Sequence, residues 1–371
     1  MKIACWGYYG KQNLGDDLIL AELCKYIQKS APDADITVFS DEQNPEKVCN
    51  SGTIQCCPRS AKALLRASVT QDILICGPGG LMPQRGTGKL LLWIVLAMIM
   101  RIRRKSLLFL GLGIGQQNFE HAIDRFLLKI LVNLSREFVV RQKGVNDALK
   151  TQKVLETADV VFAVEQENIM EKQPKSIVFS FASVFGNLAG DECCRFVANM
   201  AKTAETLLAS GYTIHLVEFT KDRDMHLYRQ LLQRLSNTEN VVIHPYEGNP
   251  YSMIQVFQKA QLCICMRFHS LVLAAVTHTP CCVIAYSDKM DDVAQRLGIT
   301  DYTMQICPIS NLYYGRLISF DGEKFNEVLN RLIDNHETLS LHMSNAVNDL
   351  QKQARTNWNV LAEVIRRHAG K

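Results

Sequence analysis

The chain has 371 residues, of which 47% are hydrophobic and 21% are charged, the composition of a globular protein with about two domains. Its formal net charge of +4 is small, and its Lys and Arg residues are scattered except around Arg101 to Lys105. Composition and charge therefore give no indication of nucleic-acid binding.

The first predicted strand, residues 2–6, runs into the glycine-rich stretch GYYGKQNLGDD, and an apolar-periodic helix follows over residues 18–27. The glycines let the backbone approach a ligand closely, and Asn13 and Asp16 can cap the helix or contact a polar substrate. The stretch lacks the GxGxxG spacing of dinucleotide-binding loops. The alternative interpretation is a capped turn whose acidic residues are solvated.

Three more strands are predicted in this half, at residues 36–39, 72–76 and 107–110. The last two run into the glycine-rich loops GPGG, from Gly77, and GLGIG, from Gly111. Apolar strands that end in glycine-rich loops indicate a parallel sheet whose carboxyl edge lies close to a ligand.

A strongly apolar helix is predicted over residues 89–105. Its uninterrupted apolar run, Leu90 to Met100, has 11 residues, which is shorter than the ~20 that a membrane span needs. We expect a helix that is buried on all sides. The alternative is a helix that lies against the inner membrane leaflet, with basic residues on acidic headgroups: Arg101, Arg103, Arg104 and Lys105.

A helix over residues 121–135 and a strand over residues 137–141 complete the first half. Arg141 stands at the end of that strand, where it either faces the ligand crevice or forms a surface ion pair. The polar, aperiodic stretch 166–175 is the predicted linker, so the first domain is expected to span residues 1–168.

A second alternation of strands and helices predicts a second doubly wound α/β domain over residues 169–338. An amphipathic helix in the C-terminal segment 339–371 is expected to pack back across the domain interface. The predicted strands cover residues 176–181, 213–219, 241–244, 262–265 and 281–286, and predicted helices cover residues 193–210 and 225–235.

Residues 262–275, LCICMRFHSLVLAA, place Arg267 and His269 between a buried strand and a helix. A fixed cation and a titratable imidazole at this position can hold an anion and transfer a proton. Lys289, after the next strand, brings a second cation to the same edge. The alternatives are ordinary salt bridges for the Arg and the Lys, and a helix cap for the His.

The 13 cysteines show no CxxC spacing, so no structural zinc site is expected. The opening residues MKIACWGYYG are typical of a strand and a turn rather than of a signal peptide. We therefore expect a cytoplasmic protein whose cysteines are reduced and mostly packed as small hydrophobic side chains.

Five stretches in order, GYYGKQNLGDD, GPGGLMPQ, VVRQKGV, MRFHSLVLAA and YSDKM before RLGI, together resemble the polysaccharide pyruvyl transferase family. The resemblance implies two Rossmann-like domains that face each other across a cleft, similar to B-type glycosyltransferases. It also implies an enzyme that transfers the pyruvyl group of phosphoenolpyruvate to two hydroxyls of a glycan sugar. The product would be a cyclic ketal, and phosphate would be released.

The resemblance also implies roles for individual residues. The family's Arg-x-His motif falls on Arg267 and His269, and His269 is the expected general acid. Asp16 or Asp17 would accept the hydroxyl protons. Residues expected to bind phosphoenolpyruvate are Arg141, Arg267, Phe268 and Lys289, and those expected to bind the acceptor are Gly10, Asn13, Gly79 and Gly80.

The sequence departs from the family's usual pattern at four places. Asp17 stands where Glu is frequent, Pro78 interrupts the glycines, Arg85 follows Gln84 in place of an acid, and Gln142 stands where an acid often follows the strand-end Arg.

The implied route needs no cofactor and no resident metal, although a divalent ion between the phosphate and Asp16 or Asp17 is compatible with it. The family's acceptor is typically a growing, often lipid-linked glycan of a cell-surface polysaccharide or exopolysaccharide. We therefore expect peripheral contact with the cytoplasmic membrane face. One alternative is a B-type nucleotide-sugar glycosyltransferase in which Glu218 holds the ribose, and a second is a non-catalytic binding or regulatory protein on this fold.

Overall fold

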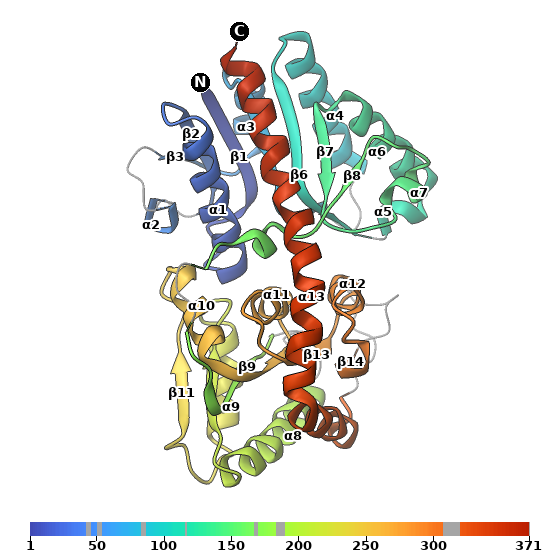
Figure 1. The fold of residues 1–371 in the computed structure, drawn as a ribbon. Coiled ribbons are helices and arrows are strands. Elements are labelled where there is room, and N and C mark those ends of the chain that lie inside the picture. Colours follow the sequence, from blue (N-terminus) through green and yellow to red (C-terminus); the bar gives the residue numbers. More distant parts are fainter. Residues whose placement is uncertain are drawn as a thin grey trace. The chain divides into compact units, whose positions relative to one another are not determined.

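The computed structural model describes residues 1–41, 46–49, 54–82, 87–115, 117–166, 170–182, 190–306 and 320–370 (Figure 1). The chain forms two compact units, Met1–Val164 with Leu350–Lys371, and Glu165–Asp349. Each unit is built on a parallel sheet with helices, so the predicted class of two α/β domains is confirmed. The departures from the family at Gln84 and Arg85 lie outside the described residues.

The sheet of the first unit has the strand order β3-β2-β1-β4-β6-β7-β8, with β5 paired to β6, and its described pairs are parallel. All five strands predicted for this half are present. The short strands β3, β5 and β8 are not predicted, because Gln, Gly or Glu interrupts their apolar residues. The strands are β1 (Lys2–Tyr9), β2 (Asp35–Ser40), β3 (Ile54–Cys57), β4 (Ile73–Cys76), β5 (Gly79–Met82), β6 (Ser106–Ile114), β7 (Glu137–Val140) and β8 (Leu155–Glu156).

Helices cover both faces of this sheet. The connection from β1 to β2 moves toward one edge, and those from β3 to β4, β4 to β6 and β6 to β7 move toward the other. Because such crossovers are right-handed, α1 lies on one face and α3, α4 and α6 lie together on the opposite face (Figure 1). The helices are α1 (Leu14–Ser30), α2 (Glu46–Cys49), α3 (Ala61–Thr70), α4 (Thr87–Ile102), α5 (Gln117–Glu120), α6 (Ala122–Leu134), α7 (Val145–Leu149) and the 3-10 helix η1 (Val160–Ala163).

Helix α4 corrects the expectation of a helix buried on all sides. Trp93 and Met100 are among the side chains on its inner face, which pack in the core between the sheet and its neighbouring helices. The opposite face is exposed to solvent at four apolar side chains: Leu91, Val95, Met98 and Ile102. A strongly apolar sequence does not reveal which of its faces the core covers.

The sheet of the second unit has the strand order β11-β10-β9-β12-β13-β14, and its described pairs are parallel. The five predicted strands are present: the strand 241–244 has its predicted bounds, and the ends of the others differ by a few residues. The short β14 is not predicted. The strands are β9 (Gln173–Ser180), β10 (Thr213–Val217), β11 (Val241–His244), β12 (Ala260–Cys265), β13 (Cys281–Ala285) and β14 (Thr303–Gln305). The helices are α8 (Gly190–Ala209), α9 (Asp224–Leu232), α10 (Pro250–Lys259), α11 (Phe268–Val276), α12 (Asp288–Arg296) and the 3-10 helix η2 (Thr300–Tyr302).

The C-terminal helix, α13 (Gly322–Ala369), begins well before the predicted start at residue 339. Its residues up to Asp349 belong to the second unit, and those from Leu350 onward belong to the first. The contacts thus divide the chain after Val164 and after Asp349, whereas the sequence placed the divisions after residues 168 and 338. The predicted apolar stripe is buried at Leu350, Ala354, Trp358, Leu361 and Ile365.

No helix within the described ranges combines the length and the apolar character needed to cross a membrane. The cysteines of those ranges are free thiols, and most of those on strands are buried. Burial raises the pKa of the Cys5 and Cys282 thiols far above the ordinary value, so these side chains stay neutral.

A histidine pair on β10 and β11 makes the stability of the second unit depend on pH. Nδ1 of His215 lies 3.0 Å from Nε2 of His244, and burial, followed by the charge of His244, lowers the pKa of His215 to about 4. An unfolded histidine titrates near 6.5, so between these values the unfolded state binds more protons. The stability that comes from the neutral, buried His215 is therefore fully present above pH 6.5 and is lost as the pH falls toward 4.

We expect the free energy of unfolding to drop by about 1 kcal/mol between pH 7 and pH 5, after allowance for partial exposure. His215→Asn keeps a polar side chain that does not titrate, so its thermal midpoint, followed by circular dichroism, should vary less with pH. An unchanged pH dependence in that variant would rule out His215 as the source.

Candidate active site

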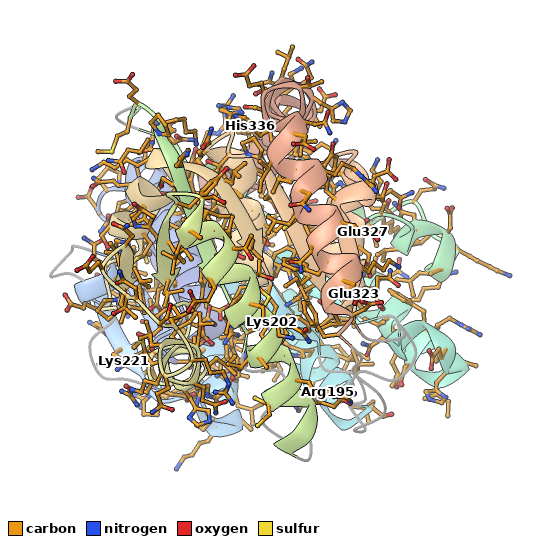
Figure 2. The ribbon with its side chains drawn as sticks, turned by 90° about the horizontal axis from the view of Figure 1, so that it is seen from below. Arg195, Lys202, Lys221, Glu323, Glu327 and His336 are labelled. Atoms are coloured by element: carbon orange, nitrogen blue, oxygen red, sulfur yellow. The ribbon has the colours of Figure 1, made fainter. Side chains whose placement is uncertain are left out.

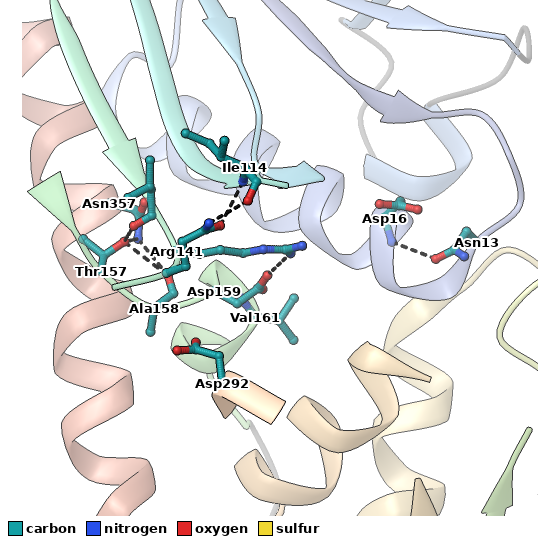
Figure 3. A network of polar contacts seen from close by, with 12 residues as sticks. Asn13, Asp16, Ile114, Arg141, Thr157, Ala158, Asp159, Val161, Asp292 and Asn357 are labelled. Atoms are coloured by element: carbon teal, nitrogen blue, oxygen red, sulfur yellow. Dashed lines mark hydrogen bonds and ion pairs between the residues drawn. The ribbon is translucent and has the colours of Figure 1, made fainter. Parts of the chain in front are cut away.

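The first helix of the chain begins at an asparagine cap beside the carboxyl edge of the first sheet. Asn13 Oδ1 accepts hydrogen bonds from the backbone N–H groups of Gly15 and Asp16, at 3.1 and 3.2 Å (Figure 3). The capping interpretation is therefore right for Asn13. Asp16 is half-buried, whereas Asp17 is only 4% exposed. Of the two predicted proton acceptors, Asp16 is the more accessible.

Two predicted acceptor-binding glycines lie between Asp16 and Arg141. A Cβ atom on Gly79 would lie 3.8 Å from Asp16 Oδ1, and one on Gly80 would lie 3.7 Å from Arg141 Nη2. A Cβ atom on Gly113 would come within 2.9 Å of the same guanidinium, which would have to shift to make room for it. Asp16, Gly79, Gly80 and Arg141 thus lie near one another along one edge of the sheet. The remaining predicted glycine, Gly10, forms the turn after β1 at φ +74.

Arg141 leaves the end of β7 and is 8% exposed. Its Nη1 donates to Asp159 Oδ2 at 2.6 Å, and Asp159 Oδ1 accepts from the backbone N–H of Val161 at 3.0 Å (Figure 3). Arg141 therefore forms an ion pair, and this pair is buried rather than on the surface. Asn357 on α13 holds the two residues that precede Asp159, because its Nδ2 donates to Thr157 Oγ1 and to the carbonyl oxygen of Ala158.

Gln142, one of the departures from the family pattern, joins the ends of β6 and β7. Its Oε1 accepts from the backbone N–H of Ile114 at 2.9 Å, and its Nε2 donates to the carbonyl oxygen of Ile114 at 2.6 Å. A carboxylate can accept the first hydrogen bond but cannot donate the second. An amide is therefore the side chain that satisfies both backbone groups.

In the second unit, Arg267 immediately precedes α11 and forms an ion pair with Asp224, the first residue of α9. Asp224 is fully buried, and its Oδ2 accepts from the backbone N–H groups of Phe219 and Thr220, both at 3.0 Å. Burial by itself would lower the pKa of Arg267, but the charge of Asp224, the hydrogen bond to Asp224 and the nearby Tyr286 and Tyr228 together outweigh it, and the pKa of the guanidinium is raised. Arg267 is therefore a permanently charged, fixed cation. Its buried Nε has no hydrogen-bond partner among the described residues.

Phe268 brings the other predicted residues of this unit together. The ring of His269 lies edge-on to the ring of Phe268, with centroids 5.0 Å apart, and Lys289 Nζ lies 5.1 Å from the Phe268 centroid. Phe268 itself is 4% exposed, His269 is half-buried and Lys289 is exposed. Arg267, His269 and Lys289 therefore gather around the first turn of α11.

Asp224 was not predicted from the sequence, and Glu218 was named only as the ribose-binding acid of the glycosyltransferase alternative. The sequence did offer one signal for Asp224, because it is an acid directly before the predicted helix 225–235. Glu218 is 2% exposed, and its two oxygens accept from the backbone N–H groups of Asp222 and Tyr246, at 2.7 and 2.9 Å. Burial is the main reason that its pKa is raised. Glu218 thus serves the local backbone.

The described part of the chain holds no group of three or more His, Cys, Asp or Glu side chains arranged to bind a metal ion.

Residues 13–288 match the sequence profile of one family, described as polysaccharide pyruvyl transferase, and this match covers more than half of the chain. The chain belongs to the polysaccharide pyruvyl transferase family. The resemblance that rested on five short motifs is thereby confirmed. A search of curated proteins found no match.

Solved structures that resemble this pyruvyl transferase family member share its fold at low sequence identity. The UDP-GlcNAc 2-epimerase of Neisseria meningitidis, bound to UDP-GlcNAc, has 11% identity and a TM-score of 0.60 over 98% of this chain and 100% of that one. The UDP-GlcNAc 2-epimerase of Methanocaldococcus jannaschii has 10% identity and a TM-score of 0.60 over the same shares. Anabaena HepE, in complex with UDP and glucose, has 15% identity and a TM-score of 0.55 over 99% of each chain. These matches confirm the predicted B-type glycosyltransferase-like fold.

Proposed function

We propose that this protein transfers the pyruvyl group of phosphoenolpyruvate to two hydroxyls of one sugar in a glycan, in the biosynthesis of a cell-surface polysaccharide or exopolysaccharide. The reaction takes place in the cytoplasm and needs only the donor and the acceptor. Membership of the family supports the reaction class.

The observation that carries the proposal is the grouping of Arg267, His269 and Lys289 around Phe268. Phosphoenolpyruvate carries a phosphate and a carboxylate on a small carbon frame, so its site needs more than one cation in fixed geometry. The buried ion pair with Asp224 fixes Arg267, and the unpartnered Nε of its guanidinium offers a further hydrogen bond. Lys289 supplies the second cation.

In the proposed route, cationic His269 protonates the methylene carbon of phosphoenolpyruvate and makes the neighbouring carbon electrophilic. The first sugar hydroxyl adds to that carbon, the bond to the phosphate oxygen breaks, and the second hydroxyl closes the ketal. Of the two hydroxyl protons, one balances the proton given to the methyl group and the other leaves on phosphate. Asp16 is the proposed base, because Asp17 is almost fully buried.

The acceptor side of the proposal rests on the first unit. Gly79 and Gly80 leave the edge between Asp16 and Arg141 without side chains, so a sugar ring can approach the backbone there.

The structural neighbours bound to UDP favour one rival, a nucleotide-sugar glycosyltransferase. That rival requires an acid to hold the ribose, and Glu218 was the candidate. Because Glu218 is almost fully buried and both of its oxygens accept from backbone N–H groups, it does not fit that role. The pyruvyl transfer is therefore the better supported of the two.

Thermal unfolding with and without ligand tests the proposal, because a ligand that binds only the folded state raises the midpoint. We expect phosphoenolpyruvate to raise it, and Arg267→Lys to abolish the rise while keeping a cation for Asp224. Arg195→Lys, at an exposed ion pair with Glu192, is the matched control and should keep the rise.

A rise with a UDP-sugar in place of phosphoenolpyruvate would identify a glycosyltransferase instead. If neither ligand raises the midpoint and no phosphate is released with any glycan acceptor, the protein is a binding or regulatory member of the fold.

A further inference from the structure

Three helices of the first unit, α3, α4 and α6, form one continuous outer layer on the sheet (Figure 1). Helix α4 is the middle one and contacts both of the others. Helices α4 and α6 run in the same direction, because Thr87 Oγ1 donates to Asp124 at one end and Arg101 Nη1 donates to the carbonyl oxygen of Asn133 at the other. We call the solvent side of this layer the α3/α4/α6 face.

The middle of this face is an exposed apolar stripe along α4. Leu91, Val95, Met98 and Ile102 are 48%, 40%, 42% and 82% exposed. Their spacing of four, three and four residues places them on one side of the helix.

Apolar side chains on both neighbouring helices extend the stripe into a patch. Ile123 and Phe126 on α6 are 66% and 64% exposed, and Leu65 and Val69 on α3 are 40% and 46% exposed. Most of the exposed large hydrophobic side chains in the described ranges therefore lie on these three helices. Single exposed hydrophobic residues are common, but a contiguous patch of this kind marks an interaction surface.

The exposed charges of the three helices have one sign. The one acidic residue in the sequences of α3, α4 and α6 is Asp124, and its side chain is buried at 4% exposure. The exposed basic residues are Lys62 and Arg66 on α3, Lys89 and Arg101 on α4, and Arg125 and Lys129 on α6, and Arg103 and Arg104 directly follow α4. By contrast, the outer surface of the second unit carries both signs, with Arg195 and Lys202 on α8 and Glu323 and Glu327 on α13 (Figure 2).

We propose that the α3/α4/α6 face binds the surface of an anionic lipid bilayer. The apolar side chains enter the boundary between headgroups and acyl chains, and the surrounding Lys and Arg side chains pair with lipid phosphates. A second copy of the chain is the less suitable occupant, because a symmetric contact would bring two sets of uncompensated cations together. The proposal goes beyond the pyruvyl transfer and would hold for any reaction on a lipid-linked acceptor.

Co-sedimentation with phosphatidylcholine vesicles, with and without phosphatidylglycerol, tests the proposal. We expect the wild-type protein to bind the vesicles that contain phosphatidylglycerol and to be released by high salt. Two double variants should each weaken that binding by about tenfold. They are Met98→Ser with Ile102→Ser, and Arg103→Gln with Arg104→Asn, in which Asn suits the left-handed backbone at position 104.

Matched changes outside the face are the controls. Leu341→Ser removes a 70% exposed apolar side chain from α13, and Lys202→Gln with Lys221→Gln removes two exposed cations from the second unit (Figure 2). Neither should change vesicle binding. The proposal is overturned if the wild-type protein binds no vesicles, or if the control variants weaken binding as much as the others.

A dimer that Met98→Ser with Ile102→Ser dissociates, without vesicle binding, would also overturn the proposal and identify a second copy as the occupant. The assay contains no phosphoenolpyruvate and no glycan. Its outcome is therefore independent of the proposed reaction.

Discussion

Replacing His269 with Ala is expected to lower turnover by about 10²–10⁴-fold, the usual contribution of a general acid. The imidazole lies at the first turn of α11 beside Phe268, whose ring also lies near Lys289 Nζ. Because the variant keeps both cations, the rise in thermal midpoint with phosphoenolpyruvate should remain. Phosphate release measured with a glycan acceptor gives the turnover, and thermal unfolding gives donor binding.

His226→Ala is the matched control, because His226 is an exposed histidine on α9 of the same unit. It should leave both measurements unchanged. Turnover within a few-fold of the wild-type value in His269→Ala would show that another group protonates the methylene carbon. If the variant loses the rise in midpoint but its turnover recovers at saturating phosphoenolpyruvate, His269 is a binding residue.

Replacing Asp224 with Ala is expected to cost about 3–5 kcal/mol of stability, because it leaves the buried side of Arg267 without its counter-charge. The same change removes the acceptor of two backbone N–H groups, those of Phe219 and Thr220. The thermal midpoint should fall by about 10 °C. Asp224→Asn keeps an oxygen that can accept from the backbone, so its loss should be smaller.

Asp222→Asn is the control for Asp224, because it removes an exposed carboxylate from the same loop, at a left-handed backbone conformation that Asn tolerates. Its free energy of unfolding should change by no more than about 0.5 kcal/mol. Equal midpoints for Asp224→Ala and Asp222→Asn would mean that the Asp224–Arg267 pair contributes little to stability. The pair also explains why Arg267→Lys, rather than Arg267→Ala, is the suitable test of donor binding.

Elements with a clear repeat could be predicted from the sequence, and elements without one could not. The strand over Val241–His244 has the predicted bounds, and the buried stripe of α13 was read correctly from Leu350 to Ile365. The strand Gly79–Met82 was taken for a glycine loop, because its pairing with β6 is decided by a distant segment. The start of α13 was placed too late for a similar reason, since propensity alone does not mark where packing lets a helix begin.

The sequence by itself determined the class of the fold, the family and the positions of the predicted site residues at strand ends, because these follow from local periodicity and from short ordered motifs. Only the tertiary structure decided which partner each charge has. Asp159 neutralises Arg141 and Asp224 neutralises Arg267 across separations that no local pattern encodes. It also decided which side of α4 packs against the core. Because the helix is apolar on both sides, its sequence does not distinguish the buried side from the exposed one. The burial of side chains and the pairing of charges are properties of the folded chain. Both the proposed chemistry and the proposed membrane surface depend on them.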